Sequence, residues 1–150
     1  SISTAGIIEG INKFTKLNTE INLAISLHSA DQPTRESIMP IAKTNPLPEL
    51  KEAVLNYANT TRRQVFFEYA LIKNINDSPK ALNQLISFIK SSRLFYLNLI
   101  PLNPINGGLI PSDKLNLFQT ALDKEGVSYS VRRTFGVDID SACGQLIVNQ

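Results

Sequence analysis

The chain has 150 residues, of which 43% are hydrophobic and 19% are charged, and its formal net charge is +2. These values favour one globular unit without a membrane-spanning segment, and so small a net charge does not by itself indicate nucleic-acid binding. One cysteine and one histidine are too few for an intrachain disulfide, a zinc site or an iron–sulfur cluster built from this chain alone. Scarce cysteine suits a reducing compartment, so we expect a cytoplasmic protein with no membrane partner.

The chain opens with the β-branched run SISTAGII, which has neither an initiating methionine nor a helix cap. We therefore expect the chain to be part of a longer protein and to begin inside a structural element. No internal repeat, low-complexity tract or interdomain linker interrupts the remaining sequence. Residues 1–150 are accordingly predicted to form a single domain.

Segments with strand and helix patterns alternate along the chain. Ile21, Leu23 and Ile25 share one parity, which predicts a half-buried strand. Other strands are predicted where aromatic and β-branched residues gather, and helices where leucine and isoleucine recur at helical spacing. The predicted strands cover 21–29, 64–72, 95–104 and 128–134; the predicted helices cover 46–60, 79–92 and 113–125, the last capped by Ser112 and ended by Gly126.

Strand, helix, strand order over this length predicts an α/β fold whose strands pair in parallel through right-handed crossovers. In such folds ligands bind at the carboxyl ends of the strands, so polar residues there are candidates for a site. The residues at these predicted positions are Ser3, Thr4, Ser26, His28, Asn103 and the tail that carries Cys143.

Cys143 lies in the polar, glycine-flanked tail GVDIDSACGQL rather than in an apolar run, which predicts a loop able to fold over the strand ends. Asp138 and Asp140 would raise the pKa of its thiol, which argues against a permanently ionised nucleophile of the protease type. His28 is open to three interpretations: a general base, a ligand contact, or a polar group satisfied at a strand end.

Three weaker features leave alternatives open. Glu68, within the hydrophobic strand QVFFEYALI, is either a buried functional carboxylate or a solvent-facing residue at a ragged edge. Gly107 and Gly108 lack phosphate-loop spacing and are typical of a turn. The pairs Arg62/Arg63 and Arg132/Arg133 are either solvated charges near strand ends or contacts to phosphate groups.

Six segments resemble a known family in order along the chain: SISTAG, LAISLHSA, Arg35 with IMPI, FFEYALIKNINDS, NLIPLNP and VRRTFGVDIDSACGQL. They are similar to the C-terminal half of the radical-SAM adenine methyltransferases that modify bacterial large-subunit ribosomal RNA. The best-known branch methylates C2 of one adenine of 23S ribosomal RNA and also a tRNA adenine. A close relative methylates C8 and confers antibiotic resistance.

The resemblance implies a fold and two cofactors. The family has a six-stranded partial (β/α) barrel, of which this chain would form the C-terminal part, beginning in the third strand and ending in the cysteine tail. The cofactors would be S-adenosylmethionine and a four-iron four-sulfur cluster. The CxxxCxxC loop that ligates the cluster would lie upstream, in the N-terminal half that this sequence lacks.

Roles carried over from the family fall on residues already singled out. Ser3, Ser26, His28 and Asn103 match residues that contact S-adenosylmethionine, and Leu27 belongs to the same stretch through its backbone. Cys143 matches the cysteine that becomes S-methylated. No metal ligand of the family falls within these 150 residues.

The family's chemistry explains the cysteine. Adenine C2 and C8 are sp² carbons of low nucleophilicity, so a cysteine first takes a methyl group from one S-adenosylmethionine. A second molecule yields an adenosyl radical, which removes hydrogen from that methyl group, and the carbon radical adds to adenine. A second, upstream cysteine resolves the adduct. Since that thiol is absent here, the 150 residues alone are predicted to be inactive.

Individual motifs divide between the two branches. The segments RRT and FFEY and the residue Pro101 are similar to the C2 branch, whereas SISTAGII, LFYLNLI and the pair Phe135–Gly136 are similar to the C8 relative. The INGGLI segment is shorter than is usual in the C2 branch. We expect C2 methylation, with C8 methylation as the alternative.

Two other function classes are open to the same residues. The chain could be an RNA-binding module without radical chemistry, using its arginine pairs on phosphates. It could also be a thiol hydrolase that uses Cys143 with His28. No feature of the sequence indicates an oligomeric state.

Overall fold

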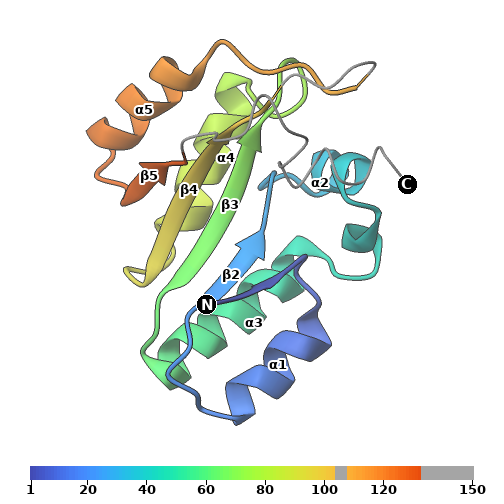
Figure 1. Ribbon diagram of the computed structural model, residues 1–150, viewed down its shortest axis with the longest axis vertical. Coiled ribbons are helices and arrows are strands. Elements are labelled where there is room, and N and C mark those ends of the chain that lie inside the picture. The colour runs from blue at the N-terminus through green and yellow to red at the C-terminus, as the bar shows by residue number, and fades with distance from the viewer. Residues whose placement is uncertain (104–107, 133–150) are drawn as a thin grey trace.

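The computed structural model describes residues 1–103 and 108–132, and these build a five-stranded, wholly parallel sheet (Figure 1). The strands lie side by side in chain order. They are β1 (Ile2–Thr4), β2 (Leu23–Ser26), β3 (Val65–Leu71), β4 (Phe95–Pro101) and β5 (Tyr129–Val131). The α/β class and the parallel pairing predicted from the alternating pattern are confirmed.

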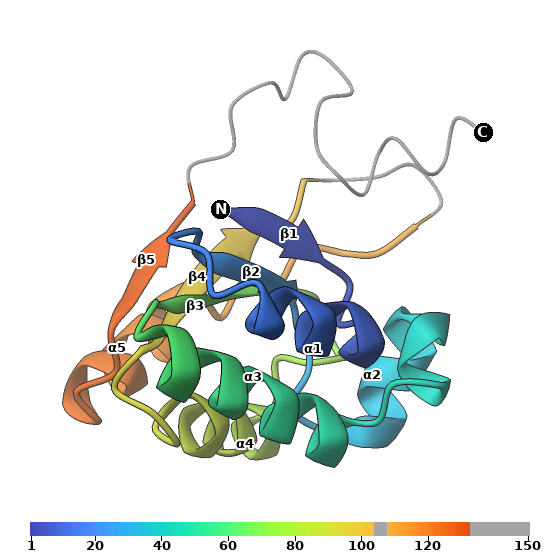
Figure 2. The same cartoon turned by 90° about the horizontal axis from the view of Figure 1, so that it is seen from below.

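The connections between strands are helical, and Figure 2 shows that the helices gather on one side of the sheet. This arrangement follows from right-handed crossovers between neighbouring parallel strands. The helices are α1 (Ile8–Lys16), α2 (Gln32–Ile38), the 3₁₀ turn η1 (Pro40–Lys43), α3 (Leu47–Thr61), α4 (Pro79–Ile89) and α5 (Leu115–Lys124). None of these helices has the length and apolar character that a membrane crossing requires.

Alternation along the strands sorts side chains between the two faces of the sheet. In β3, Val65, Phe67, Tyr69 and Leu71 are buried and belong to the core packed under the helices. The residues between them belong to the opposite face, which we call the open face because no described helix covers it. Its central members are Ala24, Ser26, Phe66, Glu68, Ala70, Tyr96, Asn98 and Ile100.

The predicted strand 21–29 ends earlier than expected, at Ser26. The backbone of His28 has a φ of 54°, in the left-handed region, which extended strand residues do not adopt. The amides of Leu27 and His28 both donate to the carbonyl oxygen of Glu68, at 3.0 Å and 3.1 Å. The chain therefore turns at the carboxyl end of β2.

Ser112 does not cap α5, so that prediction was wrong. The helix begins at Leu115 with Lys114 as its N-cap, and the Ser112 hydroxyl donates instead to the Asp77 carboxylate at 2.6 Å. An antiparallel bridge between Ile72 and Pro111 holds this segment against the end of β3. The Ser112 hydroxyl also accepts a hydrogen bond from the Lys114 amide at 3.1 Å, so it supports the turn before α5 rather than the first turn of the helix.

Two helices were not anticipated. Helix α1 follows β1 directly, and α2 begins after Asp31, whose side chain accepts a hydrogen bond from the Thr34 amide at 3.2 Å. Both helices are short, with nine and seven residues, and α1 begins within the β-branched run SISTAGII, which by itself favours a strand. Helix α2 is nevertheless important, because it carries the fully buried Arg35.

Candidate functional site

The parallel register brings several predicted residues to one edge of the sheet. Ser26 is the last residue of β2, and Leu27 and His28 form the turn that follows it. Asn103 lies two residues beyond the end of β4. Ser3 pairs with Ala24, so it lies lower along the strands than Ser26, and it is exposed. The carboxyl ends of β2 and β4 therefore carry four of the five residues predicted to bind a cofactor.

His28 is held in one tautomer. Its Nδ1 accepts a hydrogen bond from the main-chain amide of Ala70 at 3.0 Å, which places the ring proton on Nε2. Burial, with a further contribution from the positive charge of Arg35, lowers the pKa of His28 to about 4. At neutral pH the imidazole is uncharged, and its remaining polar group is an N–H donor.

This geometry argues against one of the three interpretations of His28. One ring nitrogen is satisfied by the main chain, and the other is protonated, so the ring cannot accept a proton without losing its bond to Ala70. The arrangement disfavours a general base. It leaves a hydrogen-bond donor at the end of β2, which suits contact with a polar ligand.

Asn103 is buried, with 5% of its surface exposed. Its Nδ2 atom has no hydrogen-bond partner among the residues that the structure describes. An unsatisfied buried amide donor costs about 1–3 kcal/mol, so such groups usually meet a ligand or an ordered water. Asn103 is therefore suited to donate to an acceptor bound at the strand ends.

Leu27 has little hydrogen-bonding capacity left for a ligand. Its side chain is fully buried in the core, and its amide donates to Glu68. Its carbonyl oxygen already accepts from the Ser29 amide at 2.7 Å and from Arg35 Nε at 3.2 Å. Any contact of Leu27 with a ligand would be van der Waals contact with the main chain.

A polar row crosses the open face of the sheet. Ser26, Glu68, Asn98 and Ser130 are register partners on four adjacent strands. Ser130 Oγ donates to Asn98 Oδ1 at 2.8 Å. Glu68, whose side chain is 24% exposed, lies 3.8 Å from the guanidinium of Arg132. Glu68 thus occupies a central strand rather than a ragged edge, and it is half-buried and paired.

Asn98 and Ser130 were not singled out from the sequence. The available signal was that Asn98 is the fourth residue of the apolar run FYLNLI, as Glu68 is the fourth residue of VFFEYAL. Polar residues at one parity of neighbouring apolar strands indicate a shared polar face. Next to this row, the rings of Phe66 and Tyr96 contact each other at 5.5 Å between centroids, so the open face has an apolar part beside its polar part.

Asn76 was not singled out from the sequence, yet it organises the site. It is fully buried, and its Nδ2 donates to the carbonyl oxygens of His28 and Ala70, each at 2.7 Å. Its Oδ1 accepts from the Ile72 amide at 2.7 Å, and its own carbonyl accepts from the Tyr69 hydroxyl. The turn after β3 is thereby bonded to the turn after β2.

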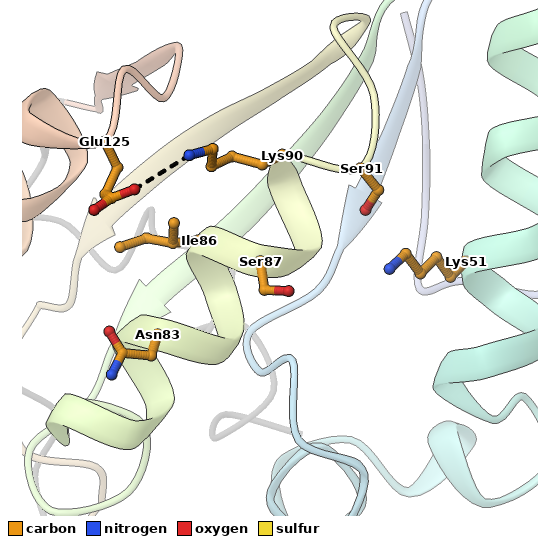
Figure 3. Close-up of a pocket in the computed structure, with 7 residues that line it drawn as sticks. All are labelled: Lys51, Asn83, Ile86, Ser87, Lys90, Ser91 and Glu125. Atoms are coloured by element: carbon orange, nitrogen blue, oxygen red, sulfur yellow. Dashed lines mark hydrogen bonds and ion pairs between the residues drawn. The ribbon is translucent and has the colours of Figure 1, made fainter.

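A surface hollow of about 540 Å³ lies elsewhere (Figure 3). It is lined by residues of α3 and α4 and by Glu125 just after α5, including Lys51 and Lys90. Lys90 pairs with Glu125 across it at 3.1 Å. This hollow is on the helix-covered side of the sheet, and no residue predicted for a site lines it.

Cys143, Gly107 and Arg133 lie outside the residues that the structure describes, so the carrier role of Cys143 stays a prediction. Within residues 1–103 and 108–132, no three metal-ligating side chains gather at one place. The described part of the site consists of hydrogen-bond donors and acceptors.

No protein-family model matches the chain. Three curated relatives are each named probable dual-specificity RNA methyltransferase RlmN. The protein of Spiroplasma citri is 44% identical over 147 residues, that of Geobacillus kaustophilus 42% over 149, and that of Streptococcus mutans 40% over 154. These matches cover 97%, 97% and 99% of this chain but 42%, 40% and 43% of the relatives. The chain thus spans about two fifths of their length.

Two solved structures resemble the fold. A radical SAM methyltransferase from Sphaerobacter thermophilus matches with a TM-score of 0.87 and 36% identity, over 95% of this chain and 42% of that protein. A domain of pyruvate-formate lyase-activating enzyme from Bacteroides vulgatus matches with a TM-score of 0.66 and 17% identity, over 86% of this chain and 78% of that domain. The second likeness concerns the fold alone.

Proposed function

We propose, from its homology to the radical-SAM RNA methyltransferases, that this chain is the C-terminal part of an enzyme that methylates an adenine carbon of RNA. The substrate would be 23S ribosomal RNA at C2 of adenine, with tRNA as a second substrate, and the enzyme would act in the cytoplasm. The observation that carries the proposal is the 44% identity to one such relative over 97% of this chain. C8 methylation is the alternative regiochemistry.

The strand-end residues fit S-adenosylmethionine as a ligand. Asn103 has a buried amide donor without a partner among the described residues, and His28 has an Nε2–H donor. Ser26 adds a half-buried hydroxyl at the end of β2. Such neutral donors suit the ribose hydroxyls and the carboxylate of this cofactor. When bound, S-adenosylmethionine would supply both the methyl group and the radical chemistry.

The chain does not fit the iron–sulfur cluster. Its single cysteine cannot ligate a cluster that needs three or four thiolates. The ligands would therefore come from a part of the enzyme outside this chain. The roles proposed for the residues of this chain are therefore cofactor binding, cofactor orientation and methyl transfer.

Cys143 is proposed as the methyl carrier. Its thiolate sulfur would form a bond to the methyl carbon as the bond from that carbon to the cofactor's sulfonium breaks, with loss of the thiol proton. A carrier is needed because adenine C2 and C8 are too weakly nucleophilic to attack a sulfonium methyl directly.

The two other function classes receive less support. A thiol hydrolase needs a histidine base, but His28 is neutral, protonated on Nε2 and bonded to Ala70 through Nδ1. Of the arginines that an RNA-binding module would use, Arg132 lies 3.8 Å from Glu68 and Arg63 lies 3.3 Å from Glu20, so each would exchange a surface ion pair for a phosphate contact. Arg63 also precedes β3, at the edge of the sheet opposite the site.

The proposal is tested in cells that lack their own adenine-C2 methyltransferase. The full-length reading frame that contains this chain is expressed, and nucleosides of ribosomal RNA and tRNA are analysed by mass spectrometry. We expect 2-methyladenosine in ribosomal RNA. A peak of 8-methyladenosine would instead establish the alternative, and the absence of both products, with the protein folded and carrying its cluster, would refute the function.

A further inference from the structure

Arg35 is a buried cation without an acidic partner. Its side chain in α2 is fully buried, and no carboxylate among the described residues forms an ion pair with it. Its guanidinium instead donates to four main-chain carbonyl oxygens. The acceptors are Ala5 (2.8 Å, from Nη2), Ser26 (3.2 Å, from Nη2), Leu27 (3.2 Å, from Nε) and Asn45 (3.5 Å, from Nη1).

The four acceptors belong to the ends of two strands and to the segment before α3. Ala5 follows β1, Ser26 ends β2, and Leu27 begins the turn to His28. The chain also passes close to the guanidinium at Gly6, where an added Cβ would come within 2.9 Å of Nη2. One side chain thus connects the carboxyl ends of two neighbouring strands.

A packing role alone does not require this residue. Burying an uncompensated charge is costly, and an apolar side chain of similar volume usually stabilises a core at least as well. Several donors in a fixed plane are useful where carbonyl groups must be held at set positions, a geometry that the guanidinium provides and lysine does not. The number and placement of the acceptors therefore indicate a geometric role.

The turn that Arg35 contacts adopts a backbone that needs support. His28 has a φ of 54°, a left-handed conformation that the Cβ of a non-glycine residue disfavours. Arg35 holds the carbonyl of Leu27 just before it, and Ala70 holds its ring. Loss of the first contact would free the turn to relax.

We propose that Arg35 is the positioning residue of the Ser26–His28 turn: its guanidinium sets the carbonyls of Ser26 and Leu27 so that His28 keeps its bond to Ala70 and presents its Nε2–H donor. The effect of Arg35 on cofactor binding rests on the proposed function. Arg35 itself acts through His28.

Hydrogen exchange tests the positioning role without any cofactor. The Ala70 amide, which donates to His28 Nδ1, is compared with the Leu97 amide, which donates to Ser128 in the sheet. In Arg35→Lys and Arg35→Met we expect exchange at Ala70 to accelerate about tenfold or more relative to Leu97, as a local opening would produce. Lysine keeps the positive charge but lacks the planar set of N–H donors, so the Arg35→Lys variant tests the donor geometry separately from the charge.

Leu122→Ala is the matched control, because Leu122 is fully buried in α5 and remote from the turn. It lowers global stability, so it should accelerate Leu97 without singling out Ala70. A uniform acceleration in both Arg35 variants, or an unchanged ratio between Ala70 and Leu97, would overturn the positioning role.

A second measurement connects the turn to the cofactor. Calorimetric titration of S-adenosylmethionine into the full-length enzyme should show affinity about tenfold lower for Arg35→Lys and unchanged for Leu122→Ala. Unchanged affinity in the Arg35→Lys variant would show that the position of the Ser26–His28 turn does not affect cofactor binding. If the unmodified enzyme fails to bind the cofactor, the proposed function falls, whereas the exchange experiment still decides the role of Arg35.

Discussion

Asn76 donates its side-chain amide to the carbonyl oxygen of His28 at 2.7 Å, across a sequence separation of 48 residues. The same nitrogen also reaches the carbonyl oxygen of Ala70, whose amide donates to the ring of His28. Main chain and side chain of His28 are therefore both bound to the end of β3. The two turns at the candidate site form one hydrogen-bonded unit.

Asn76→Asp is expected to lower the free energy of unfolding by about 2–4 kcal/mol, because two buried carbonyl oxygens lose their donor and face a carboxylate. Urea denaturation measures the change. The control is Asn83→Asp, the same substitution at an exposed position in α4, where we expect a change below about 0.5 kcal/mol. Equal effects at the two positions would contradict the role given to Asn76.

His28 should give the protein a defined acid sensitivity. The pKa of His28 is about 4 in the folded chain, below the 6.5 of an unperturbed histidine, so the unfolded chain binds the proton more readily. Neutral His28 therefore contributes to the free energy of unfolding. This contribution is complete above pH 6.5 and is lost as pH falls toward 4, and it amounts to about 3 kcal/mol at most.

Two measurements check this prediction. The imidazole resonance of His28, unique because the chain has one histidine, should titrate near pH 4. The stability difference between wild type and His28→Gln should narrow as pH falls from 6.5 to 4, because the wild type alone carries this histidine linkage. A resonance titrating near 6.5 would contradict the buried, neutral state.

Asp77 should anchor the segment before α5. Its carboxylate accepts from Ser112 Oγ at 2.6 Å and from the Asn74 amide at 2.9 Å, and its side chain is 3% exposed. Asp77→Ala is expected to cost about 2–3 kcal/mol of unfolding free energy, since both donors lose a charged acceptor.

Asp113→Ala is the control for this anchor. Asp113 is exposed and lies 4.0 Å from Lys73, so its removal should change stability by less than about 0.5 kcal/mol. Thermal or urea denaturation of both variants provides the comparison. A loss at Asp113 as large as that at Asp77 would show that local charge, rather than the buried hydrogen bonds, holds the segment.

Cys143→Ala in the full-length enzyme should abolish methyl transfer, because the sulfur that carries the methyl group is removed. Iron content and the absorption of the cluster should remain those of wild type, since its ligands are proposed to lie elsewhere. Methylated nucleosides are measured by mass spectrometry alongside the iron assay. Residual methylation at the wild-type rate would refute the carrier role.

Much of the fold could be predicted from local patterns. The alternation in QVFFEYALI predicts a strand at 64–72, and the structure has β3 at Val65–Leu71. Leucine and isoleucine spacing likewise predicts α3 and α4, with boundaries that differ by a few residues. These predictions succeeded because burial on one face imposes a period of two on strands and of 3.6 on helices.

The same patterns failed where a long-range hydrogen bond decides the outcome. Ser112 has the local features of a helix cap, but its hydroxyl bonds the Asp77 carboxylate and the Lys114 amide, and the helix begins only at Leu115. The residue type of Asn76 is typical of a turn, but its side-chain amide donates to the carbonyl oxygens of His28 and Ala70, at the ends of two strands. Residue type and spacing do not specify the partner of a short polar side chain.

Sequence patterns were sufficient to derive the α/β class, the parallel pairing and the strand-end position of Ser26, His28 and Asn103, because these follow from periodicity and from the direction of parallel strands. The chemistry open to these residues depends on their tertiary contacts. The tautomer of His28, the unpartnered amide of Asn103 and the four carbonyl acceptors of Arg35 depend on groups brought together from distant segments. Hydrogen bonding in a buried site is specified by such three-dimensional neighbours, which a one-dimensional pattern does not contain.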